Sequence, residues 1–561
     1  MQKTAAWLAR HALEQIGVRH TFGIPGVHNT EIYDELGASE TITPVLVAHE
    51  GGGAFMADAV SRTGAGLGTL VIVPAAGVTH AASGIGEASL DGIPMLVIAG
   101  GVRRDTGRAY QLHDMDQHAL LKPITKGTWR VERHADVVPT IYEAYRVATS
   151  GEPGPVFVEI PVELQLIPGD AGELPRFEGS SPRTRTPPVA EIDRAAALLR
   201  HAARPGIFCG WGAVDAGEEL ERLADGLGAP VATTLQGLSA FRGNHALHAG
   251  FALGPSAVPA SQKAFQACDC LLAIGTRFAE IPTGSFGYEP PANLIHVDIN
   301  PKVFGANYPA AVAIEGDARE VVAALAARLG DVPLAAARRQ QVAAQIAADK
   351  AAYLDEWLAH DPAGRVNPAR FFRALRARLP DDGIVVADDG NHTFLAAELM
   401  PIHAPRCFFS PSDFNSMGYC IPGVIGAKLA RPEATVVGLM GDGSFGMSAG
   451  ELETVGRLGL PLVIVQFNNG CFGWIKVLQE LFREGRHFGV DFCDVDHAAI
   501  ARGFGLVGMR VTEPDDLVPA LHEAFACGGP AFVDVVTESE NEELPPVARW
   551  QKARQEERAD A

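Results

Sequence analysis

The stretch GLMGDGSFGMSAGELETVGRLGLPLVIVQFNNG, residues 438–470, holds two apolar runs with an amphipathic segment between them. The first run ends at Asp442, which lies between two glycines, and the second ends at the pair Asn468 and Asn469. We predict a buried strand over residues 434–440, a helix over 447–458 and a second buried strand over 461–467. Because parallel strands joined by a crossover helix usually lie side by side, their carboxyl ends should meet at one sheet edge.

The polar residues at these two strand ends predict a cation site. Asp442 and Asn469 should lie one or two strand spacings apart, each about 4.8 Å, in the crevice where open α/β sheets bind ligands. A carboxylate and an amide oxygen form an incomplete shell, which Mg²⁺ completes with phosphate oxygens and water. The amides of Gly443 and Ser444, in a glycine turn that opens a helix, suit the same phosphate. The alternative is an Asp N-cap followed by an Asn-rich turn, which the GDG triplet alone would favour.

The same alternation of apolar runs and helical stretches recurs along the chain. Examples of the apolar runs are GTLVIVPAAG (68–77), IPMLVIAGG (93–101), CLLAIGTRF (270–278) and NLIHVDINP (293–301). Fully apolar strands separated by helices indicate a parallel sheet that is covered on both faces. The sequence therefore predicts an α/β protein with three doubly wound parallel-sheet domains.

Changes in composition suggest where these domains begin and end. We predict domains over residues 1–170, 188–335 and 365–545. A polar, Pro-rich linker (179–188) follows the first domain, a charged helical connector (338–360) precedes the third, and a polar tail (549–561) ends the chain. The central domain has glycines at its strand ends but no ordered GxGxxG, which argues against a nicotinamide cofactor.

Composition excludes several kinds of partner. The chain of 561 residues has a net charge of -21, which would repel nucleic acids and anionic membranes. Bound phosphate must therefore be held locally, by backbone amides or a metal. The eight cysteines show no metal-ligand spacing and are expected to be buried free thiols of a reducing compartment. Without a signal-peptide core or a long apolar run, the chain is predicted to be cytoplasmic, with no membrane span.

GDG, then residues 444–467, then NN resembles the thiamine diphosphate motif of the superfamily of acetolactate synthase, benzoylformate decarboxylase and benzaldehyde lyase. The resemblance extends over nearly the whole chain. FGIPGVHNTEIYDEL (22–36) and AHEGGGAFMADAVSR (48–62) are similar to its pyrimidine-binding domain. IHVDINP (295–301) and IEGDARE (314–320) are similar to its central domain, and the segment 417–445 is similar to its diphosphate-binding domain.

This resemblance implies a Mg²⁺ site and a diphosphate site in the third domain. The Mg²⁺ ligands would be the side chains of Asp442 and Asn469 and the backbone carbonyl of Cys471. The DDGNH segment resembles the family's pyrophosphate-contacting loop, which here corresponds to Gly390, Asn391 and His392.

The resemblance also implies how the rest of the cofactor is held. Met417 matches the large apolar residue between the two cofactor rings, a gap that a flexible thioether fills well. The carbonyl of Asn415 would accept a hydrogen bond from the pyrimidine amine. Glu50 matches the glutamate that bonds a pyrimidine nitrogen and promotes loss of the thiazolium proton. We expect Glu50 to be buried, with its pKa raised by burial. In the family these two halves come from two subunits, so a homodimer or homotetramer is expected.

The resemblance leaves open which reaction the bound cofactor carries out. The cofactor ylide attacks a 2-oxo acid, carbon dioxide leaves, and the resulting enamine is either protonated to an aldehyde or joined to a second carbonyl. Pyruvate decarboxylases have an acid where this chain has Ile475, and acetolactate synthases have a tryptophan where it has Leu478. The flavin-contacting segment of the synthases is not recognisable in residues 248–261, which argues against FAD.

Two histidines are candidates for proton transfer. His28 matches an active-site histidine of benzaldehyde lyase, and His113 lies near a position where relatives have a glutamine. The histidine of benzoylformate decarboxylase corresponds to Val73. Imidazoles suit proton shuttling at neutral pH, so His28, His113 and Glu50 form the predicted catalytic set.

The sequence therefore predicts a thiamine diphosphate- and Mg²⁺-dependent enzyme that acts on a small 2-oxo acid, with carboligation or aldehyde release. A lyase for 2-hydroxy ketones or 2-hydroxyacyl-CoA thioesters is the alternative enzyme. A catalytically silent cofactor-binding homologue is the alternative from another class. Silent relatives typically lose the glutamate or the metal pair, whereas Glu50, Asp442 and Asn469 are all present here.

Overall fold

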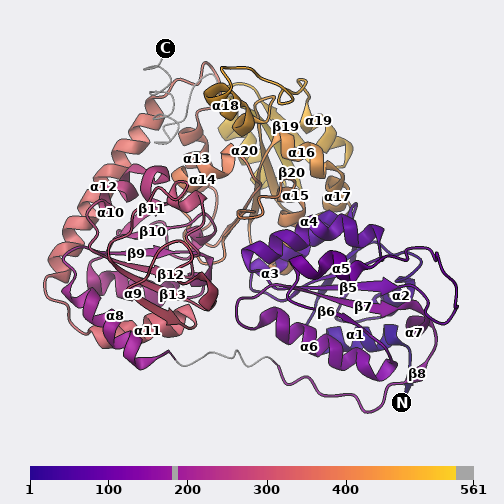
Figure 1. Cartoon of the computed structure of the whole chain (residues 1–561). Helices are drawn as coiled ribbons and strands as arrows, with labels where there is room; N and C mark the ends of the chain where they lie inside the picture. Colours follow the sequence, from indigo (N-terminus) through magenta and orange to yellow (C-terminus); the bar gives the residue numbers. More distant parts are fainter. Residues whose placement is uncertain (180–186, 539–561) are drawn as a thin grey trace.

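The computed structural model describes residues 1–179 and 187–538. It contains three parallel sheets, each of six strands, with helices on both faces. This confirms the predicted class of three α/β domains (Figure 1). Residues 180–186 of the predicted linker, the predicted tail 549–561 and the end of the third predicted domain (539–545) lie outside the described residues. The domain boundaries themselves stay a prediction.

The N-terminal sheet has the strand order β3-β2-β4-β5-β7-β6. Its strands are β2 (His20–Gly23), β3 (Thr43–Leu46), β4 (Gly68–Ile72), β5 (Met95–Gly101), β6 (Thr128–Arg130) and β7 (Pro155–Pro161). The helices are α1 (Ala5–Gln15), α2 (Thr30–Gly37), α3 (Glu50–Arg62), α4 (Ala76–Asp91), α5 (Gln117–Leu121), α6 (Val137–Thr149) and α7 (Val162–Leu166). The short strands β1 (Gln2–Lys3) and β8 (Gly169–Asp170) pair antiparallel beside this sheet.

The central sheet has a different order, β11-β10-β9-β12-β13-β14. Its strands are β9 (Pro205–Cys209), β10 (Val231–Thr233), β11 (His248–Phe251), β12 (Cys270–Ile274), β13 (Asn293–Asp298) and β14 (Val312–Glu315). The helices are α8 (Val189–His201), α9 (Gly217–Leu227), α10 (Pro259–Phe265) and α11 (Ala318–Leu329). The long helix α12 (Ala335–Ala359) runs along the outside of this domain to the C-terminal domain (Figure 1).

The C-terminal sheet has the order β16-β15-β17-β18-β20-β19. Counted along the chain, this is the same order as in the N-terminal sheet. The strands are β15 (Ile384–Ala387), β16 (Phe408–Phe409), β17 (Val436–Gly441), β18 (Val463–Asn468), β19 (Val507–Val511) and β20 (Ala531–Val536). The helices are α13 (Pro368–Arg376), α14 (Asn391–Leu399), α15 (Cys420–Ala430), α16 (Asp442–Ser448), α17 (Leu452–Leu458), α18 (Gly473–Phe482), α19 (His497–Gly503) and α20 (Leu517–Ala526).

The connection between β17 and β18 differs from the predicted single helix over 447–458. The chain becomes helical at Asp442, immediately after the strand, and forms α16. A 3₁₀ turn at residues 449–451 then leads into α17, which ends at Leu458 as predicted. The apolar pattern located the second helix because that helix packs on the sheet. It did not locate α16, whose sequence GSFGMS lacks such a pattern.

The N-terminal and C-terminal domains pack on each other through α3 and α15. At their crossing Gly426 lies so close to α3 that an added Cβ would be 2.2 Å from the carbonyl oxygen of Met56. Apolar side chains of both domains form one continuous core across this contact. In Figure 1 the orange and yellow C-terminal domain accordingly lies against α3 and α4 of the indigo and purple N-terminal domain.

Two other sequence-based expectations concern thiols and membranes. The cysteines are unpaired as expected, but Cys493 and Cys527 are exposed rather than buried. Among the helices of residues 1–179 and 187–538, none is both long and apolar enough to cross a membrane.

Candidate active site

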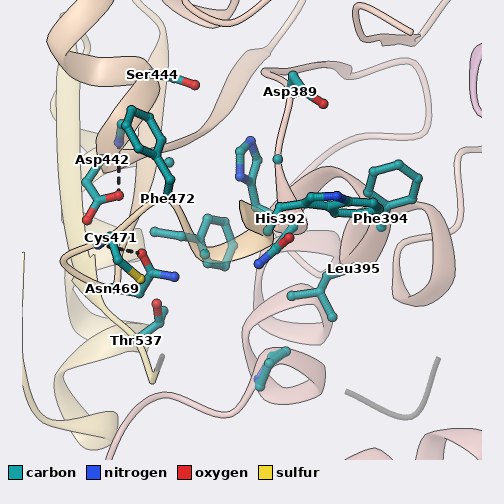
Figure 2. Close-up of a pocket in the computed structure, with 18 of the residues that line it drawn as sticks. Asp389, His392, Phe394, Leu395, Asp442, Ser444, Asn469, Cys471, Phe472 and Thr537 are labelled. Carbon is teal, nitrogen blue, oxygen red and sulfur yellow. Dashed lines mark hydrogen bonds between the residues drawn. The ribbon is translucent and has the colours of Figure 1, made fainter. Parts of the chain in front are cut away.

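The two polar strand ends of the opening motif meet at one sheet edge. Strands β17 and β18 are direct neighbours, with Gly441 paired to Phe467. Asp442 is the first residue of α16, and Asn469 directly follows β18. Both line the same cavity, of about 280 Å³. Figure 2 shows Asp442, Asn469 and Cys471 gathered on one side of it.

Asp442 is fixed by its surroundings. Its Oδ1 accepts a hydrogen bond from the amide of Gly443 at 2.9 Å, and its Oδ2 accepts one from the amide of Gly470 at 2.7 Å. Burial raises the pKa of the carboxyl to about 6. The ring of Phe472 packs on Gly443, where an added Cβ would lie 2.5 Å from a ring carbon. A side chain at position 443 would therefore require the Phe472 ring to move.

The two adjacent asparagines have different roles. Asn468 still belongs to β18, and its Nδ2 donates to Oδ1 of Asp534 at 3.0 Å, inside the domain. The Oδ1 of Asn469 accepts a hydrogen bond from the amide of Cys471 at 3.3 Å. Of the pair, only Asn469 lines the cavity.

Gly390, Asn391 and His392 line the same cavity as Asp442 and Asn469, and Figure 2 shows His392 on the helix α14 side of it. The resemblance suggested that this segment is a loop, but the structure shows a helix start. Gly390 precedes α14, and Asn391 and His392 belong to its first turn. Burial lowers the pKa of His392 to about 3, so its ring is neutral. The buried Nε2 of His392 and Oδ1 of Asn391 have no hydrogen-bond partner among the described residues. Such orphaned polar atoms indicate a place for a polar ligand.

Two neighbouring acids were missed in the sequence. Asp388 is buried at the end of β15 and accepts hydrogen bonds from the amides of Gly418 (2.9 Å) and Cys420 (2.8 Å). It also accepts one from the hydroxyl of Ser444 at 2.8 Å. The phosphate contact predicted from the sequence is the backbone amide of Ser444, which this hydrogen bond does not involve. Asp389 lines the cavity, where burial and the charge of Asp388 raise its pKa to about 7. Both follow an apolar strand, the same signal that identified Asp442.

The loop that contains Asn415 and Met417, residues 410–419, is held by the N-terminal domain. Glu87 of α4 accepts two hydrogen bonds from this loop. Its Oε1 accepts one from the amide of Ser412 at 3.3 Å, and its Oε2 accepts one from the amide of Ser416 at 3.1 Å. Asn415 adopts a left-handed conformation with φ of 63°, which is uncommon for residues other than glycine. Asn415 and Met417 both line the cavity.

Glu50 is buried, as expected, at the first position of α3. Its Oε2 lies 3.0 Å from Nδ1 of His80. The turn before α3 is held by Glu451 of the C-terminal domain, whose Oε1 accepts the amides of Ala48 (3.1 Å) and His49 (3.0 Å). Gly52 permits this approach, because an added Cβ there would lie 2.3 Å from that oxygen. Glu50 itself does not line the cavity of its own chain.

His28 and His113 contact each other. Their Nδ1 atoms are 3.0 Å apart, so one ring donates and the other accepts. Burial, and then the neighbouring imidazole, lower the pKa of His28. His113 has a left-handed φ of 67°, in an exposed loop beyond β5. The structure thus brings the two predicted histidines together, in the domain that contains Glu50.

The described residues fit Mg²⁺ and a diphosphate. Carboxylate and amide oxygens suit the hard cation, and the orphaned polar atoms belong to Asn391 and His392, which line the same cavity. The roles of all these side chains stay predictions.

Comparisons with known proteins identify the family to which the three domains belong. Residues 2–120 match the family description "Thiamine pyrophosphate enzyme, N-terminal TPP binding domain". Residues 192–325 match its central domain, and residues 388–535 match its C-terminal TPP binding domain.

Similar proteins cover nearly the whole chain. The acetolactate synthase large subunit of Corynebacterium glutamicum is 31% identical, over 97% of this chain and 88% of its own length. The isozyme 2 large subunit of Escherichia coli is 32% identical, over 96% of both chains. The large subunit of Haemophilus influenzae is 31% identical, over 96% of this chain and 95% of its own. The chain therefore belongs to the thiamine diphosphate-dependent enzymes, in the family of the acetolactate synthase large subunits.

Proposed function

We propose that this enzyme decarboxylates a 2-oxo acid with bound thiamine diphosphate and Mg²⁺. The remaining fragment is then joined to a carbonyl acceptor or released as an aldehyde. The observation that supports this most directly is the position of Asp442 and Asn469 on adjacent strand ends, in a chain similar to acetolactate synthases over nearly its whole length.

The C-terminal domain would bind the polar end of the cofactor. Asp442, Asn469 and the backbone carbonyl of Cys471 would hold Mg²⁺, while Asn391 and His392 offer unpaired polar atoms to the diphosphate. With a pKa near 3, His392 is a neutral hydrogen-bonding group and not an acid. When bound, thiamine diphosphate supplies a thiazolium that stabilises a carbanion.

The N-terminal domain would handle protons. The Glu50 carboxyl can take up or release a proton at Oε1 while Oε2 stays bonded to His80. The His28–His113 pair offers a second proton, held between two Nδ1 atoms. Position 475 holds an isoleucine and not an acid, so these histidines are the groups we assign to protonating a newly formed alkoxide. We include no flavin, since segment 248–261 does not resemble the flavin-contacting segment of the synthases.

Product analysis tests the reaction. Incubation of a panel of 2-oxo acids with thiamine diphosphate, Mg²⁺ and an added aldehyde should release carbon dioxide and give 2-hydroxy ketone beside free aldehyde. Chiral chromatography separates the products. In His28→Ala the ketone share should fall while carbon dioxide release persists. Free aldehyde alone with every acceptor would leave a simple decarboxylase, and no carbon dioxide from any acid would contradict the proposal.

We also propose that two chains share each active site, in a homodimer or homotetramer. The described residues that line the cavity run from Ile281 to Glu538, with none from the N-terminal domain. Glu50 must therefore reach a cofactor bound in another copy. Symmetric pairing of two copies would place each N-terminal domain over the partner's cavity.

Mixed dimers test this arrangement. When Glu50→Gln and Asp442→Ala chains are refolded together, each mixed dimer contains one intact site if sites lie between chains. Random pairing then restores about a quarter of the wild-type activity. If each site lies within one chain, every site carries one defect and the mixture stays inactive.

A further inference from the structure

Glu50 has a partner that the proposed function does not use. His80 lies on α4, and its Nδ1 is 3.0 Å from Oε2 of Glu50. In the single chain, the side chain of Glu50 is 8% exposed, whereas that of His80 is 48% exposed. An otherwise buried carboxyl therefore has direct contact with a half-exposed imidazole.

The local structure orients this pair. The ring of His80 stacks on that of His49, with centroids 4.5 Å apart and planes inclined by 26°. His49 is fixed in turn, because its side chain accepts the amide of Gly51 at 3.0 Å. Glu50 is the first residue of α3, where the helix dipole favours a carboxylate. The contact occupies Oε2, while Oε1 is the oxygen that would lie 3.3 Å from a Cβ added at Gly77.

The other ionisable groups nearby are already engaged. Burial and the neighbouring His80 lower the pKa of His49. Tyr33 of α2 donates to the carbonyl of Val71, and burial followed by the charge of Glu50 raises its pKa. Glu451 accepts the amides of Ala48 and His49 and the hydroxyl of Thr454, and burial raises its pKa. His80 is the half-exposed group in contact with Glu50.

We propose that His80 relays protons between Glu50 and solvent. A water gives a proton to Nε2, Nδ1 gives its own proton to Oε2 of Glu50, and the imidazole returns to the neutral form with its tautomer exchanged. The reverse sequence removes a proton from Glu50. Both ring nitrogens are thus used, which an amide side chain cannot imitate. The inference rests on the proposed role of Glu50 in proton exchange.

Proton exchange with the bound cofactor tests the relay. In His80→Asn, deuterium exchange at the thiazolium carbon should slow by about 10- to 100-fold, the scale of lost supporting contacts. Calorimetry should give unchanged thiamine diphosphate affinity, and added imidazole should restore the rate. His403→Asn is the matched control, since His403 contacts Asp381 at 2.8 Å in another part of the protein. Wild-type exchange in His80→Asn, or a slow rate that imidazole does not restore, would overturn the relay.

A second readout needs no cofactor. Nuclear magnetic resonance of the unliganded protein with ¹⁵N-labelled histidine should show a protected, downfield Nδ1 proton of His80. This signal should be lost in Glu50→Ala and retained in His403→Asn. Its absence from the wild type would refute the pair. If the signal is present but the wild type shows no thiamine diphosphate-dependent exchange, the proposed function fails while the pair remains, so the two failures are distinguishable.

Discussion

The N-terminal and C-terminal domains have the same strand order along the chain, yet they hold different chemical groups at equivalent places. After β3 a short turn, residues 47–49, leads directly to Glu50 at the start of α3. After β16 the equivalent connection is longer, residues 410–419, and contains Asn415 and Met417 before α15 begins. The helices α3 and α15, which follow these two connections, pack on each other.

This difference shows how one topology can serve the two ends of a cofactor. The short connection puts a carboxyl at a helix start, and we propose that it exchanges a proton there. The long connection contains Asn415 and Met417 instead, and the ligands that we propose for Mg²⁺ lie at the ends of β17 and β18. We therefore expect C-terminal substitutions to weaken binding and N-terminal substitutions to slow proton transfer.

The largest expected effect is at the proposed Mg²⁺ site. Asp442→Ala removes the only side-chain charge proposed for Mg²⁺, so thiamine diphosphate binding should be lost at micromolar concentrations. Calorimetry with Mg²⁺, and then with a chelator, measures this loss. Undiminished binding in the variant would contradict the magnesium assignment.

Glu50→Gln should separate binding from chemistry. The amide keeps the shape and a hydrogen bond but loses the exchangeable proton. Deuterium exchange at the thiazolium carbon should slow by about 10²–10⁴-fold, the usual contribution of an acid–base group, while cofactor affinity stays near that of the wild type. An unchanged exchange rate would place the base at another residue.

Glu87→Ala tests a contact by which the N-terminal domain supports a loop of the C-terminal domain. It leaves the buried amides of Ser412 and Ser416 without acceptors, at a cost of about 1–3 kcal/mol for each unsatisfied group. The loosened loop should weaken cofactor binding by about 10- to 100-fold. Saturating cofactor should recover most of the turnover, which steady-state kinetics can measure. Glu87→Gln, which keeps one acceptor, should be milder; equal losses in both variants would show that the loop is held by other contacts.

The smallest effect concerns acid stability. The folded-state pKa of His392, about 3, lies below the value of about 6.5 in an unfolded chain. Protons therefore favour unfolding as pH falls below 6.5. Because of His392, the free energy of unfolding should fall by about 2 kcal/mol between pH 8 and pH 5. Asp388 and Asp389 have raised pKa values, so their protonation stabilises the folded state as pH falls. Both are present in the wild type and in a His392→Asn variant, so their effect cancels when the two are compared.

Urea titrations of wild type and His392→Asn at pH 8 and pH 5 measure the contribution of His392 to the change in the free energy of unfolding. The variant should lose less stability on acidification, whereas His403→Asn should behave as the wild type. Equal losses in wild type and His392→Asn would mean that the buried imidazole is protonated at little cost.

The sequence predicted the parallel sheets well, because fully buried strands and glycine turns leave a local pattern. Asp442 and Asn469 could be placed together because strand order along the chain determined which edge they share. Glu50 was predicted to be buried from its flanking apolar and glycine residues. These inferences needed only neighbouring segments.

Contacts between distant segments could not be predicted in this way. Nothing near Glu87 indicates that it holds Ser412 and Ser416, and nothing near His80 indicates that it contacts Glu50. Such pairs depend on how α3, α4 and α15 cross, which follows from side-chain packing across two domains. The first turn of α14 was likewise taken for a loop, because its polar residues mask a helix start that burial stabilises.

The contact between Gly52 and Glu451 makes the residue tolerated in one domain depend on the residue present in the other. A side chain at position 52 would occupy the space of the Glu451 carboxylate, which supports the turn before Glu50. A larger residue at position 52 would therefore require the Glu451 side chain to move, although the two positions belong to different domains. A chimaera that takes its first domain from a relative with a bulkier residue at position 52 would need a shorter residue at position 451.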